Sequence, residues 1–352
     1  MRTSRPTTIM LIRVGILTAP RIEYEQREST FVLKNVRIGI GFHWDRYENQ
    51  EFSGTLTIRD NEDGTQTAIN TLNLEEYLCS VISSEMNANS PMELLKAHAV
   101  ISRSWAIRAM EQHLHDGYHV CADDHCQRYE GLHRMNERAV AAVRATAGQV
   151  LVYDGEICDC RYHKCCGGKT EIWRTCWEDI DVPYIQSVDC PYCNPSSPRV
   201  RQLLTTALND YDQETLDFHD WQVKYTEAEL DEIIRLKTNT DYGHILALEP
   251  LHRGASGRID SLRIVGTKQT QTIGKELAIR YALSRKCLYS SWFDIHHTDG
   301  QWILTGHGWG HGAGLCQIGA AVMAAEGHAY QDILTHYYRH TQILVDRSDL
   351  EI

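Results

Sequence analysis

One glutamate stands where acid/base chemistry is possible, at the end of an apolar helical pattern. In "LNLEEYLCSVISSEM", apolar residues recur at helical spacing from Leu74 to Ile82, and Glu85 falls next in the same register. Burial disfavours the charged form of a carboxylate and raises its pKa toward the range useful to a general acid. On the pattern alone, a solvated glutamate at a helix end is the simpler interpretation, since most glutamates are exposed.

Two cations lie on the helix expected next. Lys96 and Arg103 are seven residues apart, hence on one helical face about two turns apart. Arg103 offers a bidentate fork for a carboxylate, whereas Lys96 offers a point charge. The same spacing is equally that of a solvated stripe on a helix that is otherwise buried.

A first group of thiols and imidazoles occurs in "HDGYHVCADDHC". Cys121 and Cys126 are five apart, with His115, His119 and His125 beside them. Thiolate and imidazole ligands at short spacing suit a tetrahedral zinc site. The spacing is looser than two CxxC pairs, so a disulfide or free thiols remain alternatives.

A second group of cysteines has no assigned role. Cross-bridges to the two cysteines of "CPYC", a second metal and simple buried thiols all remain open, although vicinal cysteines rarely bond to each other. The group consists of Cys158, Cys160, Cys165, Cys166, Cys176, Cys190 and Cys193.

The elements that must position these residues indicate an α+β fold. Short β-rich runs separated by polar turns fill residues 1–70, and two helices are predicted over residues 74–86 and 90–115. Asn73 and Ser90 are the predicted N-caps. The second helix is apolar over most of its girth, which predicts a central, buried helix. A polar helical insertion is expected near residues 200–245, followed by a strand in "GRIDSLRIVGT".

Composition narrows the possible partners. The chain of 352 residues has a formal net charge of -12, which argues against nucleic acid or an anionic membrane surface as partner. The early apolar stretch "IMLIRVGIL" is short and contains Arg13, so it is interpreted as a strand and not as a signal peptide or membrane span. Without a visible export signal, the cysteines alone do not decide whether the protein works in an oxidising or a reducing compartment.

Five blocks in order resemble the stage II sporulation protein D family, which includes the LytB-type amidase enhancers. They are "LNLEEYLCSVISSEMNANSPMELLKAHAVISRSWAI", "VCADDHCQRYEG", "YHKCCGGKTEIW", "GRIDSLRIVG…GKELAIRYALSRKCLYSSWFDI" and "GHGWGHGAGLCQIGA". The resemblance covers most of the chain from about residue 70, and predicts a β-rich lead-in over 1–70 and a family domain over 71–352.

The resemblance implies a lytic transglycosylase that cuts peptidoglycan glycan strands. The glutamate of the "SEM" segment, here Glu85, would be the catalytic acid/base, with Lys96 and Arg103 matching a lysine and an arginine that matter in the family. In such a reaction the 6-hydroxyl of N-acetylmuramic acid closes a 1,6-anhydro ring, so one glutamate suffices. Muramic acid stripped of its peptide exposes a lactyl carboxylate, for which the two cations are candidates.

The resemblance also implies a zinc site and sugar contacts. Zinc, in a structural role, would bind Cys121 and Cys126. His125 is adjacent to Cys126 and awkwardly placed, so His115 is favoured as a further ligand, with His119 next. The glycine-rich segment would border a glycan groove between the central helices and the β-rich lobes. The candidate sugar contacts are His311 and Gln317, and more weakly Tyr162 and His163.

Two other functions compete with this one. A non-catalytic activator of an N-acetylmuramoyl-L-alanine amidase would bind glycan and have no need of Glu85, and a zinc hydrolase would use the metal in the chemistry. A peptidoglycan substrate implies the cell envelope or another extracytoplasmic place, although no signal peptide or anchor is visible in the sequence. A cell-wall amidase is the expected protein partner.

Overall fold

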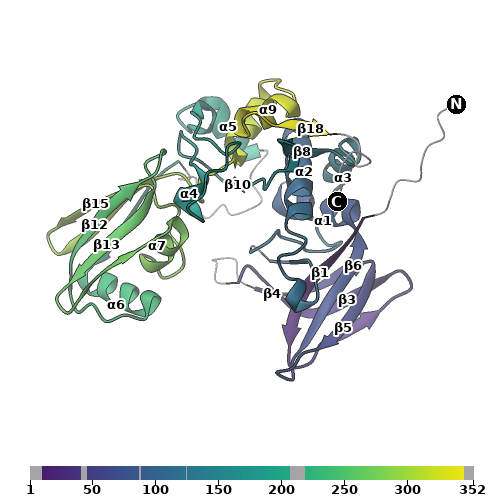
Figure 1. Cartoon of the computed structure of the whole chain (residues 1–352), viewed down its shortest axis with the longest axis horizontal. Coiled ribbons are helices and arrows are strands. Elements are labelled where there is room, and N and C mark those ends of the chain that lie inside the picture. Colours follow the sequence, from purple (N-terminus) through teal and green to yellow (C-terminus); the bar gives the residue numbers. More distant parts are fainter. Residues whose placement is uncertain (1–9, 41–45, 87–88, 124, 207–218, 345–352) are drawn as a thin grey trace. The chain divides into compact units, whose positions relative to one another are not determined.

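The computed structural model describes residues 10–40, 46–86, 89–123, 125–206 and 219–344. Within them the chain forms two compact units, each treated by itself below. Unit 1 comprises residues 1–159 with 342–352, and unit 2 comprises residues 160–341. Both units mix helices with short β-sheets, so the predicted α+β class is confirmed (Figure 1).

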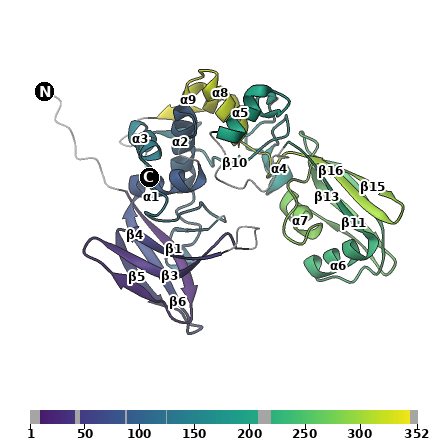
Figure 2. The same ribbon diagram turned by 180° about the vertical axis from the view of Figure 1, so that it is seen from behind.

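Unit 1 begins with β-strands, as the alternating pattern predicted. One sheet has the order β5-β6-β1-β7, a second has the order β2-β3-β4, and a third has the order β18-β8-β9. Figure 2 shows unit 1 from behind, with β1, β5 and β6 of the first sheet and β3 and β4 of the second. The strands are β1 (Leu11–Ala19), β2 (Tyr24–Gln26), β3 (Thr30–Ile38), β4 (Arg46–Ser53), β5 (Thr55–Asp60), β6 (Gln66–Asn73), β7 (Val120–Cys121), β8 (Val150–Tyr153), β9 (Glu156–Ile157) and β18 (Gln342–Leu344).

Among the described residues of unit 1, three α-helices accompany the strands, and the first follows β6 without a loop. Asn73 ends β6 and caps α1 (Leu74–Glu85), accepting a hydrogen bond from the backbone N–H of Glu75 at 2.7 Å. Helix α2 (Met92–Arg108) is buried nearly all round, as predicted, because α1, α3 (Glu137–Ala145) and β8 all pack against it.

The second predicted helix ends earlier than expected. The pattern suggested residues 90–115, but α2 stops at Arg108, and a separate 3₁₀ turn, Leu114–Asp116, follows. Its cap also differs, because Pro91 occupies the N-cap position and makes no side-chain capping bond. The shorter helix matters because the turn after it carries the histidines discussed below.

An apolar core lies between two sheets and two helices of unit 2. The sheets have the orders β11-β16-β15 and β12-β13-β14, and the core takes Trp221, Ile264 and Phe293 from their strands. Helices α6 and α7 pack on these strands (Figure 2). The elements are β11 (Asp220–Thr226), α6 (Glu227–Thr238), β12 (Ile245–Arg253), β13 (Ile259–Gly266), β14 (Thr270–Ile273), α7 (Glu276–Ala282), β15 (Phe293–Thr298) and β16 (Gln301–His307).

The rest of unit 2 consists of short elements joined by loops. Strands β10 and β17 pair in parallel, which brings residues 162 and 163 beside residues 315 and 316. The elements are β10 (Tyr162–His163), α4 (Trp173–Cys176), η2 (Pro191–Cys193), α5 (Pro198–Thr206), β17 (Leu315–Cys316), α8 (Gln317–Ala325) and α9 (Tyr330–Tyr337).

The chain divides at about residue 160, whereas the sequence suggested a boundary near residue 70. The reason is that β6 pairs with β1 and continues directly into α1, so the lead-in strands and the following helices share one unit. The predicted insertion over 200–245 is only partly helical. It contains α5 and α6, but β11 lies between them and joins a sheet; residues 207–218 are outside the described part.

Candidate functional site

Glu85 is the last residue of α1 and is half-buried. Its Oε1 accepts a hydrogen bond from the backbone N–H of Arg128 at 3.0 Å, which ties the end of α1 to a segment 43 residues away in sequence. The apolar stripe before it, from Leu74 to Ile82, is buried. The predicted register is confirmed up to this residue, and the carboxylate lies at the edge of the core.

The segment that holds Glu85 is itself fixed to α1 and α2. The amide of Gln127 accepts a hydrogen bond from the Tyr77 hydroxyl at 3.1 Å and donates one to the backbone oxygen of Ser102 at 3.3 Å. Burial raises the pKa of Tyr77 well above its ordinary value, and the nearby thiol of Cys126 adds to this shift. Tyr77 therefore stays a neutral donor to Gln127. Because Gln127 is fixed in this way, the backbone of Arg128, the residue after it, is held against Glu85.

Lys96 lies on α2 with its side chain about one quarter exposed. Its Nζ makes an ion pair of 2.6 Å with Glu93, three residues earlier on the same helix. A partly exposed pair of this kind contributes little to stability, so the amine can exchange partners at low energetic cost.

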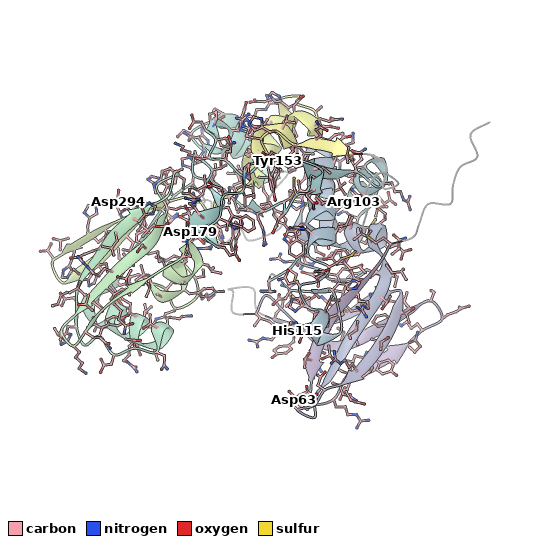
Figure 3. All side chains as sticks on the ribbon, in the orientation of Figure 1. Asp63, Arg103, His115, Tyr153, Asp179 and Asp294 are labelled. Carbon is pink, nitrogen blue, oxygen red and sulfur yellow. The ribbon has the colours of Figure 1, made fainter. Side chains whose placement is uncertain are left out.

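Arg103 occupies a different position from the one the sequence suggested. Its side chain is fully buried, and its Nε and Nη2 donate to the two carboxylate oxygens of Glu75 at 2.8 and 2.7 Å. Its Nη1 donates to the backbone oxygen of Gln149 at 3.0 Å. The bidentate fork is thus occupied by a carboxylate of the protein, and not open to a substrate carboxylate as the sequence suggested. Figure 3 labels Arg103 among the helices of unit 1.

Helical spacing predicted correctly that Lys96 and Arg103 share a helix, but not what covers each residue. Arg103 faces the start of α1, where Glu75 lies in the first turn. A favourable acidic residue at a helix N-terminus therefore also neutralises the buried guanidinium.

Four metal-binding side chains gather in the turn after α2. The possible ligand atoms of His113, Cys121, His125 and Cys126 all lie within 4.8 Å of one another. Cys126 Sγ is 3.5 Å from Nε2 of His113 and 3.6 Å from Nδ1 of His125, and Cys121 Sγ is 3.9 Å from the same Nδ1. Two thiolates and two imidazoles form a donor set that fits tetrahedral zinc.

Neighbouring groups orient the cluster. Nδ1 of His113 lies 3.1 Å from Oδ2 of Asp116, an arrangement that fixes the ring and presents Nε2 to the thiols, as outer carboxylates do in zinc sites. The hydrogen bond with Cys126 lowers the pKa of Cys121 to about 5, against the opposing effect of burial. Cys121 is therefore disposed to be a thiolate, the form that binds metal.

His115 is the second correction. Its side chain is 76% exposed and its Nε2 contacts Asp116, so it stands outside the cluster, which contains His113 and the disfavoured His125 instead. His119 is also outside, because its two ring nitrogens lie against the backbone N–H and the Nε of Arg13. A 3₁₀ turn has three residues per turn, so His113 and His115, which are two apart, point in different directions.

A pocket of about 870 Å³ opens beside the same cluster. Its lining includes His113, Cys121 and His125 together with residues of β1 and β3, such as Ile16 and Val36, but not Glu85. The pocket therefore adjoins the thiol and imidazole cluster without reaching the candidate acid.

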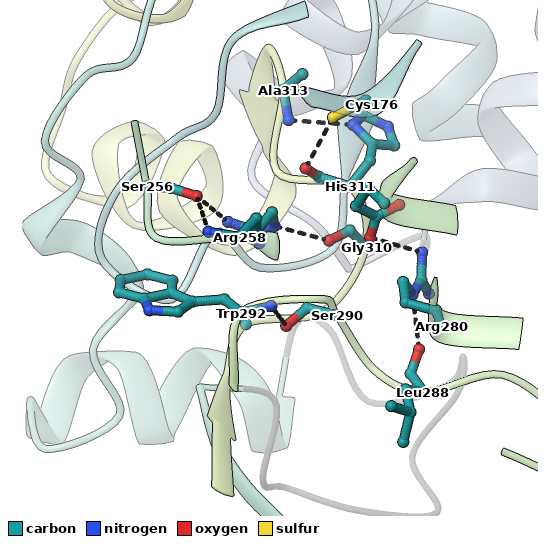
Figure 4. A network of polar contacts seen from close by, with 12 residues as sticks. Cys176, Ser256, Arg258, Arg280, Leu288, Ser290, Trp292, Gly310, His311 and Ala313 are labelled. Atoms are coloured by element: carbon teal, nitrogen blue, oxygen red, sulfur yellow. Dashed lines mark hydrogen bonds and ion pairs between the residues drawn. The ribbon is translucent and has the colours of Figure 1, made fainter. Parts of the chain in front are cut away.

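In unit 2, His311 lies in a glycine-rich loop that is fixed from several sides (Figure 4). Its Nδ1 accepts from the backbone N–H of Ala313 at 3.1 Å, so Nε2 carries the proton and donates to the backbone oxygen of Tyr162 at 2.9 Å. Arg258 Nε donates to Gly310 O at 3.3 Å, and Cys176 Sγ donates to the backbone oxygen of His311 at 3.3 Å.

The hydrogen bonds of His311 make it a loop-forming residue. Burial lowers its pKa well below the ordinary value, and His163 beside it adds to the shift. Both ring nitrogens of His311 form hydrogen bonds within the protein, so neither is left for the sugar contact that the sequence suggested.

The other three candidates of unit 2 lie close to this loop. His163 is buried, and its Nδ1 is 3.1 Å from the backbone oxygen of Ala313, while its buried Nε2 has no hydrogen-bond partner within the described residues. Tyr162 is half-buried on β10, and Gln317 is buried as the first residue of α8. The structure thus brings His311, His163 and Tyr162 together, while a sugar contact by any of them stays a prediction.

The residues that hold the others in place have no distinctive sequence pattern. Glu75 is one of two adjacent glutamates at the start of a helix, and Gln127 and Arg128 follow the last cysteine of the first group in "HCQRYEG". His113 could have been considered, since it stands two residues before His115 and eight before Cys121, but helical spacing placed it inside a helix that does not extend so far.

Comparison with known proteins shows the family to which the chain belongs. Fold and site define an α+β protein with a half-buried glutamate held beside a thiol and imidazole cluster. The Stage II sporulation protein (SpoIID) family model matches residues 62–153, and Domain of unknown function (DUF8618) matches residues 171–314. An uncharacterized protein of Brachyspira hyodysenteriae is 30% identical over 84% of this chain and 72% of that relative. The chain belongs to the stage II sporulation protein D family.

Two relatives carry names that describe a process. Stage II sporulation protein D of Bacillus subtilis is 24% identical over 78% of this chain and 76% of the relative. An amidase enhancer of Bacillus subtilis is 25% identical over 76% of this chain, which matches only 40% of the enhancer's length.

Within the described residues, no helix is both long enough and apolar enough to cross a bilayer.

Proposed function

We propose that this protein is a lytic transglycosylase that cleaves peptide-stripped peptidoglycan glycan strands, with Glu85 as its acid/base. The observation that supports it most is the carboxylate of Glu85, half-buried at the end of an apolar helix and oriented by the Arg128 N–H at 3.0 Å. Membership of a family whose relatives are named for sporulation and amidase enhancement is consistent with cell-wall chemistry.

The chemistry requires one carboxyl group that works twice. Protonated Glu85 gives its proton to the glycosidic oxygen, and the bond from the muramic acid carbon to that oxygen breaks with its electron pair leaving on the oxygen. The resulting carboxylate removes the proton of the 6-hydroxyl as this oxygen attacks the same carbon from within the sugar. The 1,6-anhydro ring closes, and Glu85 is protonated again for the next cycle.

A half-buried position suits both roles. A fully solvated glutamate would be ionised near neutral pH and could not donate a proton, whereas a fully buried one could not reach a glycan. The backbone donor sets the direction of the carboxylate without adding a charge. Lys96, partly exposed on α2, is the candidate cation for an anionic group of the substrate, since its pair with Glu93 costs little to break.

Arg103 would support the reaction from inside the protein. Its contacts with Glu75 and Gln149 join α1, α2 and the segment before β8, so its removal would loosen the helix that ends at Glu85.

We further propose a structural zinc ion bound by His113, Cys121, His125 and Cys126. Four protein ligands form a closed site, and such a site stabilises the fold and leaves no open position for chemistry. Arg128 is only two residues after Cys126, so ordering this segment would also order the N–H that Glu85 accepts from. This placement favours a supporting role for the metal over a zinc hydrolase.

The loop of unit 2 is the candidate glycan contact. His163 is the foremost candidate, since its buried Nε2 has no hydrogen-bond partner among the described residues, whereas both ring nitrogens of His311 are bound within the protein. Tyr162 and Gln317 remain candidates of the same kind. Cleavage of peptidoglycan would require the protein to act outside the cytoplasm, and a cell-wall amidase that removes the peptides would supply its substrate.

The mass of the products tests the proposal. Stripped and peptide-bearing glycan strands are incubated with the full-length protein, and the ends are weighed. Anhydro-muramyl ends from stripped strands only are the expected result. Reducing ends that carry an added water, or equal cleavage of both substrates, would contradict it.

A second candidate is a non-catalytic activator, favoured by the amidase enhancer among the relatives. Such a protein would bind stripped strands and stimulate an amidase without producing new ends. Full stimulation by a Glu85→Gln variant would favour the activator over the transglycosylase.

A further inference from the structure

Four buried cysteines of unit 2 converge on one point. The Sγ atoms of Cys166, Cys190, Cys193 and Cys316 all lie within 4.8 Å of one another, and none of the four residues is more than 1% exposed. They come from three separate stretches of the chain: the loop after β10, the η2 turn with its Cys-x-x-Cys spacing, and the end of β17. The nearest neighbours along the chain, residues 190 and 193, are joined by a single 3₁₀ turn.

The spacing of the sulfur atoms suits one metal ion. With a Zn–S distance of about 2.3 Å, tetrahedral geometry places the sulfurs about 3.8 Å apart. The Sγ atoms of Cys166 and Cys193 are 3.4 Å apart. A disulfide needs about 2.05 Å. A 4Fe–4S cluster would hold its four cysteines further apart, because each binds a different iron.

The surroundings of the sulfurs supply hydrogen-bond donors, as the surroundings of metal-bound thiolates do. Cys316 Sγ accepts from the backbone N–H groups of Cys166 at 3.3 Å and Gly319 at 3.4 Å. Cys316 is also the N-cap of α8, where the helix dipole favours negative charge. The Tyr337 hydroxyl is 3.2 Å from Cys190 Sγ.

The packing around the cluster requires a residue without a side chain. A Cβ at Gly319 would lie 2.6 Å from Cys190 Sγ and 2.4 Å from the Tyr337 hydroxyl oxygen. Glycine therefore lets α8 begin directly against the sulfur atoms. Four thiols, their donors and this close approach together form a built site rather than a chance group of buried thiols.

We propose that unit 2 holds a structural zinc ion bound by Cys166, Cys190, Cys193 and Cys316. Each cysteine binds as a thiolate, so loading releases the thiol protons to solvent, and four protein ligands leave no position for substrate. Whether this ion binds does not depend on the proposed glycan cleavage or on the zinc site proposed in unit 1.

The ion would fasten the glycine-rich loop. Cys316 is the last residue of β17, and Cys166 follows β10, the strand that pairs with it. Cys165, the residue before Cys166, pairs through its backbone with Trp309 in both directions. Removing the metal should therefore raise amide exchange around residues 307–314.

Zinc counting on the full-length protein, purified without oxygen, is the first test. Native mass spectrometry and elemental analysis should find about one zinc in a Cys121→Ser, Cys126→Ser variant, whose unit 1 cluster is disabled. X-ray absorption of that ion should give four sulfur neighbours at about 2.3 Å. In the unsubstituted chain, one zinc would have four sulfur neighbours and the other two, so the mean number of sulfur neighbours per zinc should be about three.

Variants locate the ion. Adding Cys190→Ser and Cys193→Ser to that background should remove the remaining zinc, and Gly319→Val should weaken its retention against a chelator. Cys176→Ser is the matched control, because this thiol of unit 2 is buried but lies outside the cluster, and it should keep the zinc.

Four results would overturn the proposal. The first is a protein without metal whose four thiols alkylate in the native state, and the second is a mass lowered by two hydrogens for each disulfide formed. The third is iron in place of zinc. The fourth is a nitrogen neighbour of the ion in the X-ray absorption of the variant whose unit 1 cluster is disabled. Because the first test needs no change in the proposed ligands, misfolding of the cysteine variants of unit 2 would not obscure the answer.

Discussion

The backbone N–H of Arg128 donates to the carboxylate of Glu85 across 3.0 Å, and so joins the end of α1 to the segment that follows the unit 1 cluster. Glu85 thus depends for its orientation on a stretch of chain that carries Cys121 and Cys126. The candidate acid and the candidate metal site are parts of one local arrangement.

Replacing Glu85 by Gln should abolish glycan cleavage and leave the fold intact. The amide oxygen can still accept from Arg128, but the side chain can no longer exchange a proton, which costs about 10²–10⁴-fold in rate for a general acid/base. Anhydro ends are counted by mass spectrometry, and zinc content and unfolding midpoint serve as controls. Undiminished cleavage would remove Glu85 from the mechanism.

His113 and His115 provide a matched pair for the zinc site of unit 1. His113→Ala should lower the zinc retained in the presence of a chelator, because its Nε2 is 3.5 Å from Cys126 Sγ, whereas the exposed His115→Ala should not. Elemental analysis after dialysis gives the answer. Loss of zinc with His115→Ala alone would restore the ligand that the sequence suggested.

Breaking the Arg103–Glu75 pair should destabilise the protein. Arg103→Ala should cost about 3 kcal/mol of the free energy of unfolding, at the low end for a buried pair because Glu75 is 31% exposed. Lys96→Ala, which removes a partly exposed ion pair, should cost less than about 1 kcal/mol.

Arg103→Lys separates a structural role from a substrate contact. It should restore part of the stability, and cleavage should then fall only in proportion to the folded fraction. A variant of full stability with a raised KM would instead indicate that the guanidinium touches the glycan.

His98 should make stability depend on pH. It is fully buried on α2, and burial lowers its pKa to about 3, below the ordinary 6.5 of an unfolded chain. The unfolded state therefore binds more protons between these values, so stability falls as pH falls, by up to about 1.4 kcal/mol per pH unit.

His98→Gln isolates this contribution, because a glutamine amide does not titrate. Urea unfolding of both proteins at pH 7, 6 and 5 should show a shallower loss for the variant. Parallel pH profiles would mean that His98 does not stay neutral in the folded state.

Local residue order was enough to predict several features. The capping position of Asn73, the buried helix around Ile101 and the position of Glu85 at the end of an apolar stripe all follow from contacts within one or two helical turns. Helical periodicity is a local property, so a single stretch of sequence contains it. The early strands and the strand beginning at Ile259 were predicted for the same reason.

The tertiary structure decided which residues meet. Arg103 pairs with Glu75 28 residues away, and Glu85 meets the backbone of Arg128 43 residues away. His113 is a candidate ligand only because α2 ends early and a 3₁₀ turn aims it at Cys126. Such contacts depend on how helices and turns pack, and periodicity says which face a residue occupies but not what covers that face. For the same reason the sequence left Cys166, Cys190 and Cys193 open, and only the fold brings them to Cys316.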